Sequence, residues 1–539
     1  MSSHGKRTAI LGGLYPALFG AFAVLSLFAS NFDELEPGDL ARPLLISLGA
    51  GAALTAACQW LWRDRRRGSL VASGTLIAFF SYGHFLAGLS GIQIAGRNLG
   101  HHRFALGVVG LAWLGWILWT FRRQRPVLGQ FLQGAAVLAV LVSGTGLLWR
   151  WRAAEMPLRP AILTTAGGAG QLDVGALPDI YYIVLDGYGR QDILSRYYHY
   201  DNSPFLTKLG ELGFYVADLS TANYNQTVLS LAASLNMQYV QDLVGNQTLG
   251  AEGRVRLAEA LKHSQVRAFL RAQGYELVAF ETGYSQTEIR DAEAFWGPES
   301  DSSRDEHPLL GQQISPFESL LLSTTGLRAV LDFDPLRRQL ALSSVGDPHF
   351  QAHRVRVRYT LDSLGKAAER PGPTFVIAHV ISPHPPFVFE ANGGSVANQG
   401  VYSLADADAF GGGPEEYVAL YRAQLQYLNT LVIPALEDIL QRSERPPVIL
   451  LQGDHGPGAF FVWDSAEDSL LPERMSMLNA YYFPDGDYAA LDPAISPVNS
   501  FRVVLDTYFG ETLPRLPDRS YFSSWDRPLD LIEVTDLVR

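Results

Sequence analysis

Five uncharged, mostly apolar runs dominate the first 150 residues of this 539-residue chain. They cover residues 8–30, 43–62, 69–89, 104–121 and 126–149. Each run can form a helix that crosses the hydrocarbon core of a bilayer, which takes about 20 residues. A cleaved signal peptide would account for the first run alone. The sequence therefore predicts an α-helical membrane domain of five transmembrane helices over residues 1–150.

The basic residues between these runs predict the direction of each helix. Lys6 and Arg7 precede the first run, and further arginines lie at 63–67 and 122–125, whereas loop 31–42 carries four acids. Short loops rich in Lys and Arg stay on the cytoplasmic side. We therefore expect a multi-pass protein of a bacterial inner (cytoplasmic) membrane with a cytoplasmic N-terminus. The rest of the chain would then be periplasmic or extracellular.

The two parts of the chain differ in charge. Residues 1–150 contain 13 Lys and Arg against 5 Asp and Glu, and residues 151–539 contain 29 against 49. An acidic outer part of this kind argues against a nucleic-acid partner, because phosphate backbones attract cations. Cys58 is the one cysteine in the chain, so an intramolecular disulfide is excluded.

Beyond a predicted linker at residues 151–178, apolar runs alternate with helical patterns. The predicted strands cover 179–186, 214–217, 275–280, 374–380 and 448–452. Continuous apolar strands between helices predict a sheet buried on both faces, and hence an α/β domain over residues 179–539. Residues 298–350 look irregular, as in an insertion or a set of outer loops. The Gly-rich segment 391–413 is typical of a flexible flap near a site.

Polar residues follow the predicted strands where ligands of such sheets bind. Asp186 closes one strand, His384 lies in a proline-rich loop after another, and Asp454 and His455 follow a third. Thr227 lies at the start of a predicted helix. Carboxylates with an imidazole suit Zn²⁺ or Mn²⁺, and a helix start favours an ionised hydroxyl. Taken singly, each residue also has a structural interpretation, such as a helix cap or a turn.

The order of these elements is more specific than any one of them. A strand acid, a Thr at a helix start, His-Pro-Pro-Phe and Asp-His-Gly follow one another after five membrane spans. In this the chain resembles the alkaline phosphatase/sulfatase superfamily, in the membrane-anchored branch of lipoteichoic acid synthases and lipid A phosphoethanolamine transferases. The resemblance implies a five-helix membrane domain followed by an α/β sandwich of the sulfatase/alkaline phosphatase type.

The resemblance also implies roles for single residues. Asp186, Thr227, Asp454 and His455 would bind one divalent metal ion, Zn or Mn, with Thr227 as the nucleophile. His384 and Trp296 would contact the substrate. Gly297 follows Trp296 where the synthase branch has an arginine, so one substrate contact of that branch is missing from this position.

Further departures from the family's motifs narrow the predicted metal content and activity. The first ligand is Asp186 where transferases often have Glu, and no histidine follows His455, which favours a single metal. Residues 226–230 lack the C/S-x-P-x-R run that formylglycine formation needs. Arg474, which precedes an apolar run, could face the site, although a surface position is favoured.

The implied function is metal-dependent transfer of lipid-linked phosphodiester headgroups at the outer face of the membrane through a phospho-Thr intermediate. A phospholipid would be the donor and an envelope glycan or lipid the acceptor. Two alternatives stay open: a phosphoric or sulfuric ester hydrolase of the same superfamily, and a catalytically inactive membrane sensor or scaffold. The sequence assigns neither the oligomeric state nor a task for residues 496–539.

Overall fold

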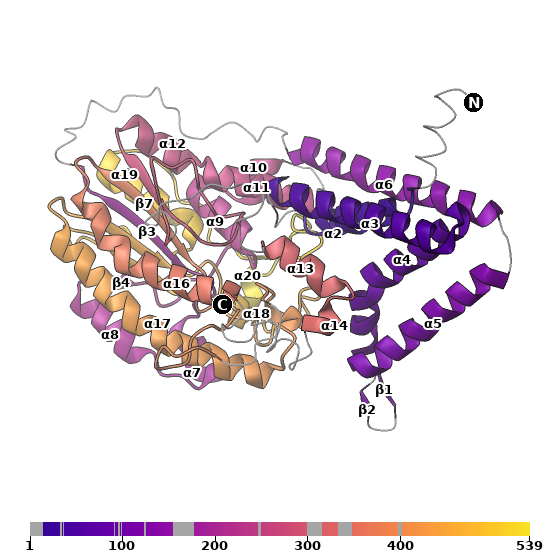
Figure 1. Cartoon of the computed structure of the whole chain (residues 1–539). Helices are drawn as coiled ribbons and strands as arrows, with labels where there is room; N and C mark the ends of the chain where they lie inside the picture. The colour runs from indigo at the N-terminus through magenta and orange to yellow at the C-terminus, as the bar shows by residue number, and fades with distance from the viewer. Residues whose placement is uncertain are drawn as a thin grey trace. The chain divides into compact units, whose positions relative to one another are not determined.

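A computed structural model describes residues 14–32, 35, 37–90, 92–94, 97–98, 100–122, 126–154, 177–245, 250–298, 315–331, 348–396 and 402–538 (Figure 1). The chain divides into two compact units. The first is formed by Met1–Ala153 with Glu306–Gly346, and the second by Ala154–Asp305 with Asp347–Arg539. Most of the predicted linker lies outside the described residues.

Long helices make up the described part of the first unit. They are α2 (Ala17–Ser30), α3 (Ala41–Trp62), α4 (Arg65–Ser90), α5 (His102–Arg122) and α6 (Pro126–Ala154). Four candidate spans, which fall on α3 to α6, are long and apolar enough to cross a membrane. Helix α2 is described over 14 residues, and the start of the first predicted span lies outside the described residues. The predicted helical membrane domain is confirmed.

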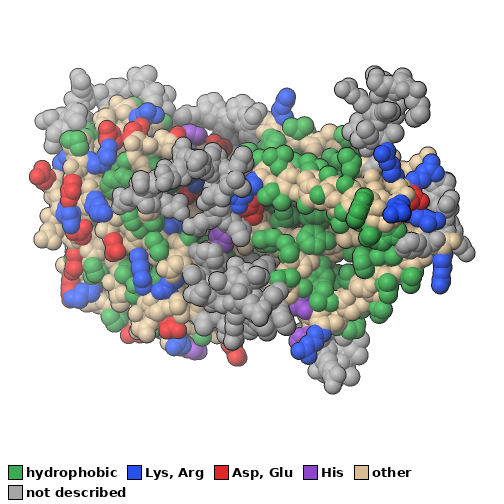
Figure 2. Space-filling model, in the orientation of Figure 1, with side chains coloured by type: hydrophobic (Ala, Val, Ile, Leu, Met, Phe, Trp, Pro, Cys, Tyr) green, Lys and Arg blue, Asp and Glu red, His purple; other side chains and the backbone are tan. Residues whose placement is uncertain are grey.

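These helices expose apolar side chains and bury small ones. Leu45, Leu111 and Leu141 are more than half exposed, and Figure 2 shows hydrophobic side chains over the surface of these helices. Such a surface is favourable in lipid and costly in water. Between α2 and α3, a Cβ added to Gly51 would lie 2.9 Å from the Cα of Ala17. Small residues at such contacts let membrane helices pack closely.

A segment from the later part of the chain belongs to this first unit. Helices α13 (Pro316–Thr324) and α14 (Arg328–Leu331) lie within the stretch predicted to be irregular. A capping box between Ser315 and Glu318 starts α13, which explains why this part is helical. Glu318 pairs with Arg42, and the ring of Phe317 meets that of Phe28 edge-on at 5.4 Å.

The second unit is built on a seven-stranded sheet. The strands are β3 (Ile180–Leu185), β4 (Tyr215–Val216), β5 (Glu276–Phe280), β6 (Ala294–Trp296), β7 (Thr374–Val380), β8 (Val448–Gln452) and β9 (Asn479–Tyr482). Their order is β4-β9-β8-β3-β7-β5-β6. The strands from β8 to β6 are parallel, and β9 and β4 join antiparallel. The predicted α/β class is confirmed, and β7 and β8 have the predicted bounds.

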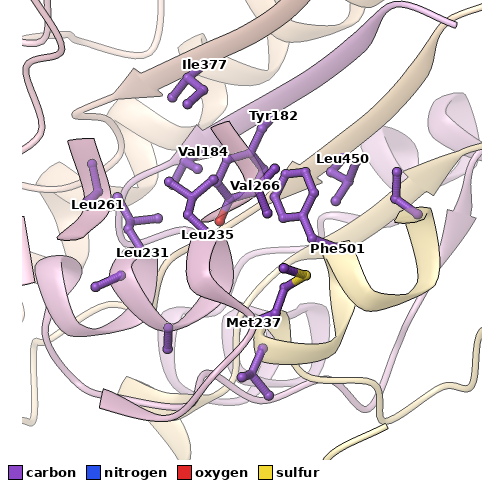
Figure 3. Packing of buried hydrophobic residues seen from close by; sticks show 14 of the residues in the cluster. Tyr182, Val184, Leu231, Leu235, Met237, Leu261, Val266, Ile377, Leu450 and Phe501 are labelled. Atoms are coloured by element: carbon purple, nitrogen blue, oxygen red, sulfur yellow. The ribbon is translucent and has the colours of Figure 1, made fainter. Parts of the chain in front are cut away.

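Helices cover both faces of this sheet, as the alternation along β3 shows. Tyr182 and Val184 join a core with α9 (Thr227–Asn236), α12 (Gln265–Ala272) and α19 (Pro497–Phe509), part of which appears in Figure 3. Tyr181 and Ile183 face the opposite way, into a core with α17 (Pro414–Arg442). Because both faces are buried, every residue of β3 is apolar or aromatic.

Shorter elements complete the described chain. In the first unit they are η1 (Pro37–Leu40), β1 (Gln93–Ile94) and β2 (Arg97–Asn98). In the second unit they are α7 (Gln191–Tyr198), α8 (Ser203–Glu211), α10 (Val240–Val244), α11 (Ala251–Lys262), α16 (Pro348–Ser363), η3 (Leu364–Glu369), η4 (Ala407–Ala409), α18 (Leu471–Met475), β10 (Tyr521–Phe522), β11 (Ile532–Glu533) and α20 (Thr535–Val538).

Candidate active site

The carboxyl ends of three adjacent parallel strands bring the predicted site residues together. Asp186 follows β3, Asp454 and His455 follow β8, and the loop with His384 follows β7. One ligand atom from each of Asp186, Asp454 and His455 lies within 4.8 Å of the others, and all three residues are buried. The hydroxyl of Thr227 lies 3.3 Å from Nε2 of His455. The four predicted ligands therefore occupy one place.

The donor set of this cluster fits a divalent cation. Asp186 Oδ1 and Asp454 Oδ2 are buried and have no hydrogen-bond partner among the described residues. Their other oxygens are used: His379 Nε2 lies 3.1 Å from Asp186 Oδ2, and the Gly187 N–H donates to Asp454 Oδ1. Buried carboxylate oxygens without partners are costly unless they bind a cation. Hard oxygens with one imidazole nitrogen are a common donor set for Zn²⁺ and Mn²⁺.

The imidazole of His455 presents a lone pair to this cluster. Its Nδ1 lies 2.9 Å from the carbonyl oxygen of Gly456, so Nδ1 carries the proton and donates it. Nε2 then faces Asp454 Oδ2 at 3.3 Å and Asp186 Oδ1 at 3.8 Å. Burial and the nearby Arg474 lower the pKa of His455, which keeps the ring neutral. A neutral ring is the form that binds a metal.

Thr227 is the first residue of α9, and the N-cap position belongs to Gln226. The Thr227 side chain therefore does not cap its own helix, which removes the structural interpretation of this residue. Asp186 likewise caps nothing, because α7 begins at Gln191 with Arg190 at its N-cap. Thr227 is partly exposed beside the buried cluster, so an incoming group can reach its hydroxyl.

The C-terminal run holds the loop that precedes Thr227. The amide of Asn225 donates to the Ser523 carbonyl at 2.9 Å, and the Ser523 N–H donates back to Asn225 Oδ1 at 2.9 Å. Gln226 donates to Ser523 Oγ and accepts from Arg254, whose guanidinium lies 3.9 Å from the Trp525 ring centroid. Residues 496–539, which had no task in the sequence, thus position the start of α9.

The sequence misjudged one residue of this place and missed another. The surface position favoured for Arg474 is wrong, and the alternative that it faces the site holds: it is 1% exposed and its Nη2 lies 3.1 Å from His455 Nε2. Asp406 comes from the predicted flap and accepts a hydrogen bond from Arg474 Nη1 at 2.5 Å. The Leu471–Met475 helix has only five residues, too short for periodicity to show which side is buried.

His384 lies next to this pair. Its Nε2 is 3.5 Å from Asp406 Oδ2, and its ring centroid is 6.2 Å from that of His455. Burial opposes protonation, but the carboxylates of Asp186 and Asp406 raise the pKa of His384. In the same way, His384 and His379 hold the pKa of Asp186 well below its usual value despite burial. His384 is therefore a candidate proton donor.

Trp296 lies away from the cluster in the order of strands. It ends the edge strand β6, which β5 separates from β7, and its ring meets Phe280 edge-on at 5.5 Å. Within the described chain no hydrogen bond or ring contact joins Trp296 to the cluster. A Cβ on Gly297 would lie 2.4 Å from Glu281 Oε2, so the Glu281 side chain would have to shift to admit an arginine there.

Comparisons with known proteins give one family model and several solved structures. The family model described as Sulfatase matches residues 178–492. No curated protein matches. Among solved structures, the membrane protein lipooligosaccharide phosphoethanolamine transferase A of Neisseria meningitidis is 11% identical, with a TM-score of 0.41 over 93% of this chain and 95% of its own. The periplasmic domain of Escherichia coli EptC in complex with Zn is 12% identical, with a TM-score of 0.40 over 70% of this chain and 96% of its own.

Proposed function

The chain belongs to the sulfatase family, and on that premise we propose that it is a metal-dependent phosphotransferase with Thr227 as its nucleophile. One observation carries the proposal. Two buried carboxylate oxygens without partners, from Asp186 and Asp454, converge with Nε2 of His455 beside the Thr227 hydroxyl. The substrate we propose is a lipid-linked phosphodiester headgroup at the outer face of the membrane.

Asp186, Asp454 and His455 would hold one divalent ion, Zn²⁺ or Mn²⁺, with Thr227 as the fourth ligand. Such an ion supplies Lewis-acid stabilisation of charge on phosphoryl oxygens and favours the ionised hydroxyl. The position of Thr227 at the start of α9 acts in the same direction, because the helix N-terminus is partly positive.

In the first step the Thr227 oxygen attacks phosphorus and displaces the lipid alcohol. The P–O bond to the diacylglycerol breaks as the bond to Thr227 forms, and the leaving oxygen takes a proton from His384. An acceptor hydroxyl on an envelope glycan or lipid then attacks the phospho-Thr, gives its proton to His384 and releases the Thr227 oxygen. Hydrolysis of a phosphoric or sulfuric ester shares this first step and differs in using water as the acceptor. The family match favours this hydrolase as the second candidate.

The helices of the first unit supply the location. Four of them are long and apolar enough to span a membrane, so a lipid donor would diffuse in the same bilayer. With the basic loops on the cytoplasmic side, the second unit lies in the periplasm or outside the cell. This orientation can be tested by labelling single cysteines introduced in each loop after Cys58→Ser.

The nucleophile is tested by comparing Thr227→Ala with Thr227→Ser in membranes containing phosphatidylethanolamine or phosphatidylglycerol labelled in the headgroup. We expect Thr227→Ala to abolish turnover and Thr227→Ser to retain part of it. Mass spectrometry should find a peptide that carries the phosphorylated headgroup on residue 227 in the wild type and in Thr227→Ser, but not in Thr227→Ala. Unchanged turnover by Thr227→Ala would refute the assignment, and a protein that binds no Zn²⁺ or Mn²⁺ would favour an inactive sensor or scaffold.

A further inference from the structure

Arg474 is a buried cation that touches three parts of the candidate active site. Its Nε donates to the Asn225 carbonyl at 3.0 Å, in the loop that leads to Thr227. Its Nη1 donates to Asp406, and its Nη2 donates to His455 Nε2 at 3.1 Å. Arg474 is 1% exposed and is bonded to residues around the proposed nucleophile, which makes it a candidate to contact the substrate.

The guanidinium is held in place before any ligand arrives. The Phe461 and Trp463 rings lie 5.2 Å and 5.3 Å from its central carbon. Asp406, which accepts from Nη1, is itself fixed by the Tyr417 hydroxyl at 2.7 Å. The same Asp406 Oδ2 lies 3.5 Å from His384 Nε2, so one carboxylate orients two cationic groups. A group ordered in advance loses little entropy when it binds.

The partner of Nη2 is the informative contact. His455 Nδ1 donates to Gly456, so Nε2 has one lone pair, which accepts from Arg474 here. If that lone pair binds a cation instead, the Nη2 N–H loses its acceptor while it remains buried. A buried N–H without an acceptor is costly. An oxygen of a phosphoryl group next to Thr227 would restore the hydrogen bond.

Building on the proposed function, we propose that Arg474 binds a non-bridging oxygen of the transferred phosphoryl group, with Asp406 as its positioning residue. A planar guanidinium suits phosphoryl oxygens and offsets the charge that develops on them. Gly297 stands where the synthase branch has an arginine, and a Cβ there would lie 2.4 Å from Glu281 Oε2. Arg474 thus supplies the cation from the segment after β8, whereas Gly297 follows β6. In the strand order, β8 and β6 lie on opposite sides of β3.

Phosphate binding tests this without turnover. Calorimetry on the full-length chain in detergent would measure the affinity for inorganic phosphate after loading with Zn²⁺, and the affinity for Zn²⁺ alone. We expect Arg474→Gln to weaken phosphate binding roughly 10- to 100-fold, the range for losing a charged hydrogen bond. Arg474→Lys should retain part of the affinity. Zn²⁺ binding by Arg474→Gln should be unchanged or tighter, because a competing cation is gone.

Arg502→Gln is the matched control. Arg502 is also a buried arginine of this unit, but it donates to the carbonyl of Met237 at 2.9 Å and belongs to α19. Its loss should lower the melting temperature and leave phosphate affinity unchanged. Asp406→Asn should weaken phosphate binding less than Arg474→Gln, because the guanidinium remains.

Two results would overturn the assignment of Arg474. One is phosphate affinity within twofold of wild type in Arg474→Gln or, if that variant does not fold, in Arg474→Lys. The other is parallel loss of phosphate affinity, Zn²⁺ affinity and melting temperature, which indicates a structural role. Phosphate binding through Arg474 without phosphorylation of Thr227 would instead refute the proposed function and leave this inference standing.

Discussion

Two buried aspartates bracket strand β3, and they differ in what their oxygens contact. Asp179 precedes the strand and is fully buried. Its Oδ1 accepts from the Thr374 N–H at 2.8 Å and from the Thr374 hydroxyl at 3.0 Å, and Arg445 Nη2 lies 3.1 Å from each oxygen. Asp186 follows the strand, is 2% exposed, and leaves Oδ1 without a partner among the described residues.

At equal burial, this difference in contacts separates a structural aspartate, Asp179, from a candidate functional one, Asp186. Asp179 is satisfied by the chain alone, so it closes the amino end of the sheet. Asp186 is incomplete without a cation, at the edge where ligands of parallel sheets bind. Burial and charge alone would not distinguish the two residues. The number of hydrogen-bond donors that each one receives does.

Replacing Asp186 should have the largest effect. Asp186→Asn keeps the shape of the side chain but removes a charged oxygen from the cluster, so we expect turnover to fall by about a thousandfold or more. The melting temperature of the metal-free protein should fall slightly, because His384 and His379 stabilise the charged carboxylate. Initial rates and thermal unfolding would check both. A large loss of stability with normal turnover would make Asp186 resemble Asp179.

Glu473 is a third buried carboxylate and provides the test by pH. Its oxygens accept from the Tyr198 hydroxyl and the Phe460 N–H, yet burial raises its pKa to about 8. A raised pKa means that the folded state binds the proton more tightly. The free energy of unfolding should therefore fall as pH rises from about 4.5 to about 8, by at most about 5 kcal/mol.

The control for this titration is Glu473→Gln. The difference between its unfolding free energy and that of the wild type should change over the same pH window and level off above it. A constant difference across the window would contradict a protonated Glu473. Denaturant titrations of the full chain at several pH values would measure it.

Replacing Asp179 should change stability and spare activity. Asp179→Ala removes the acceptor of the Thr374 N–H and the carboxylate that pairs with Arg445, and breaking such a pair costs about 3–5 kcal/mol. Turnover per folded molecule should match the wild type, because this end of the sheet is remote from the cluster. Thermal unfolding and rates normalised to folded protein would check it. Reduced turnover without a loss of stability would contradict the structural role assigned to Asp179.

His379 should have an intermediate effect on the cation. It bridges Asp186 Oδ2 and the Thr287 hydroxyl, 3.1 Å and 2.9 Å from its two nitrogens. Residues that orient a ligand in this way commonly contribute 10- to 100-fold in metal affinity, so we expect roughly that loss for His379→Ala. His379→Gln, which can still donate to Asp186, should recover part of it. Equilibrium dialysis with Zn²⁺ would measure both variants.

The smallest effect is expected from a pair in the first unit. Arg42 and Glu318 pair with each other, and their side chains are 23% and 11% exposed. A double-mutant cycle with Arg42→Ala and Glu318→Ala should give a coupling of about 1 kcal/mol or less. A coupling as large as the stability loss expected for Asp179→Ala would show that this ion pair contributes as much as the buried Asp179–Arg445 pair.

Local patterns in the sequence were enough to predict much of the fold and part of the site. Hydropathy over about 20 residues is a local property, so the membrane helices could be predicted from single stretches of the sequence. The bounds of β7 and β8 followed from apolar runs of the right length. Asp186, Asp454 and His455 could be singled out because an acid or an imidazole directly follows a buried strand, and the parallel order of β3, β7 and β8 brings such residues together.

Pairings across long stretches of chain could not be predicted in this way. Asp406 and Arg474 are 68 residues apart, and Asn225 and Ser523 are 298 apart. Neither pair has a periodic signal, because each partner lies in a loop or a short helix. The sequence by itself determined the membrane helices, the buried strands and the residues at their ends. Only the tertiary structure decided which carboxylates are satisfied and which remain open, because donors and acceptors meet through the order of strands and the folding of loops over them.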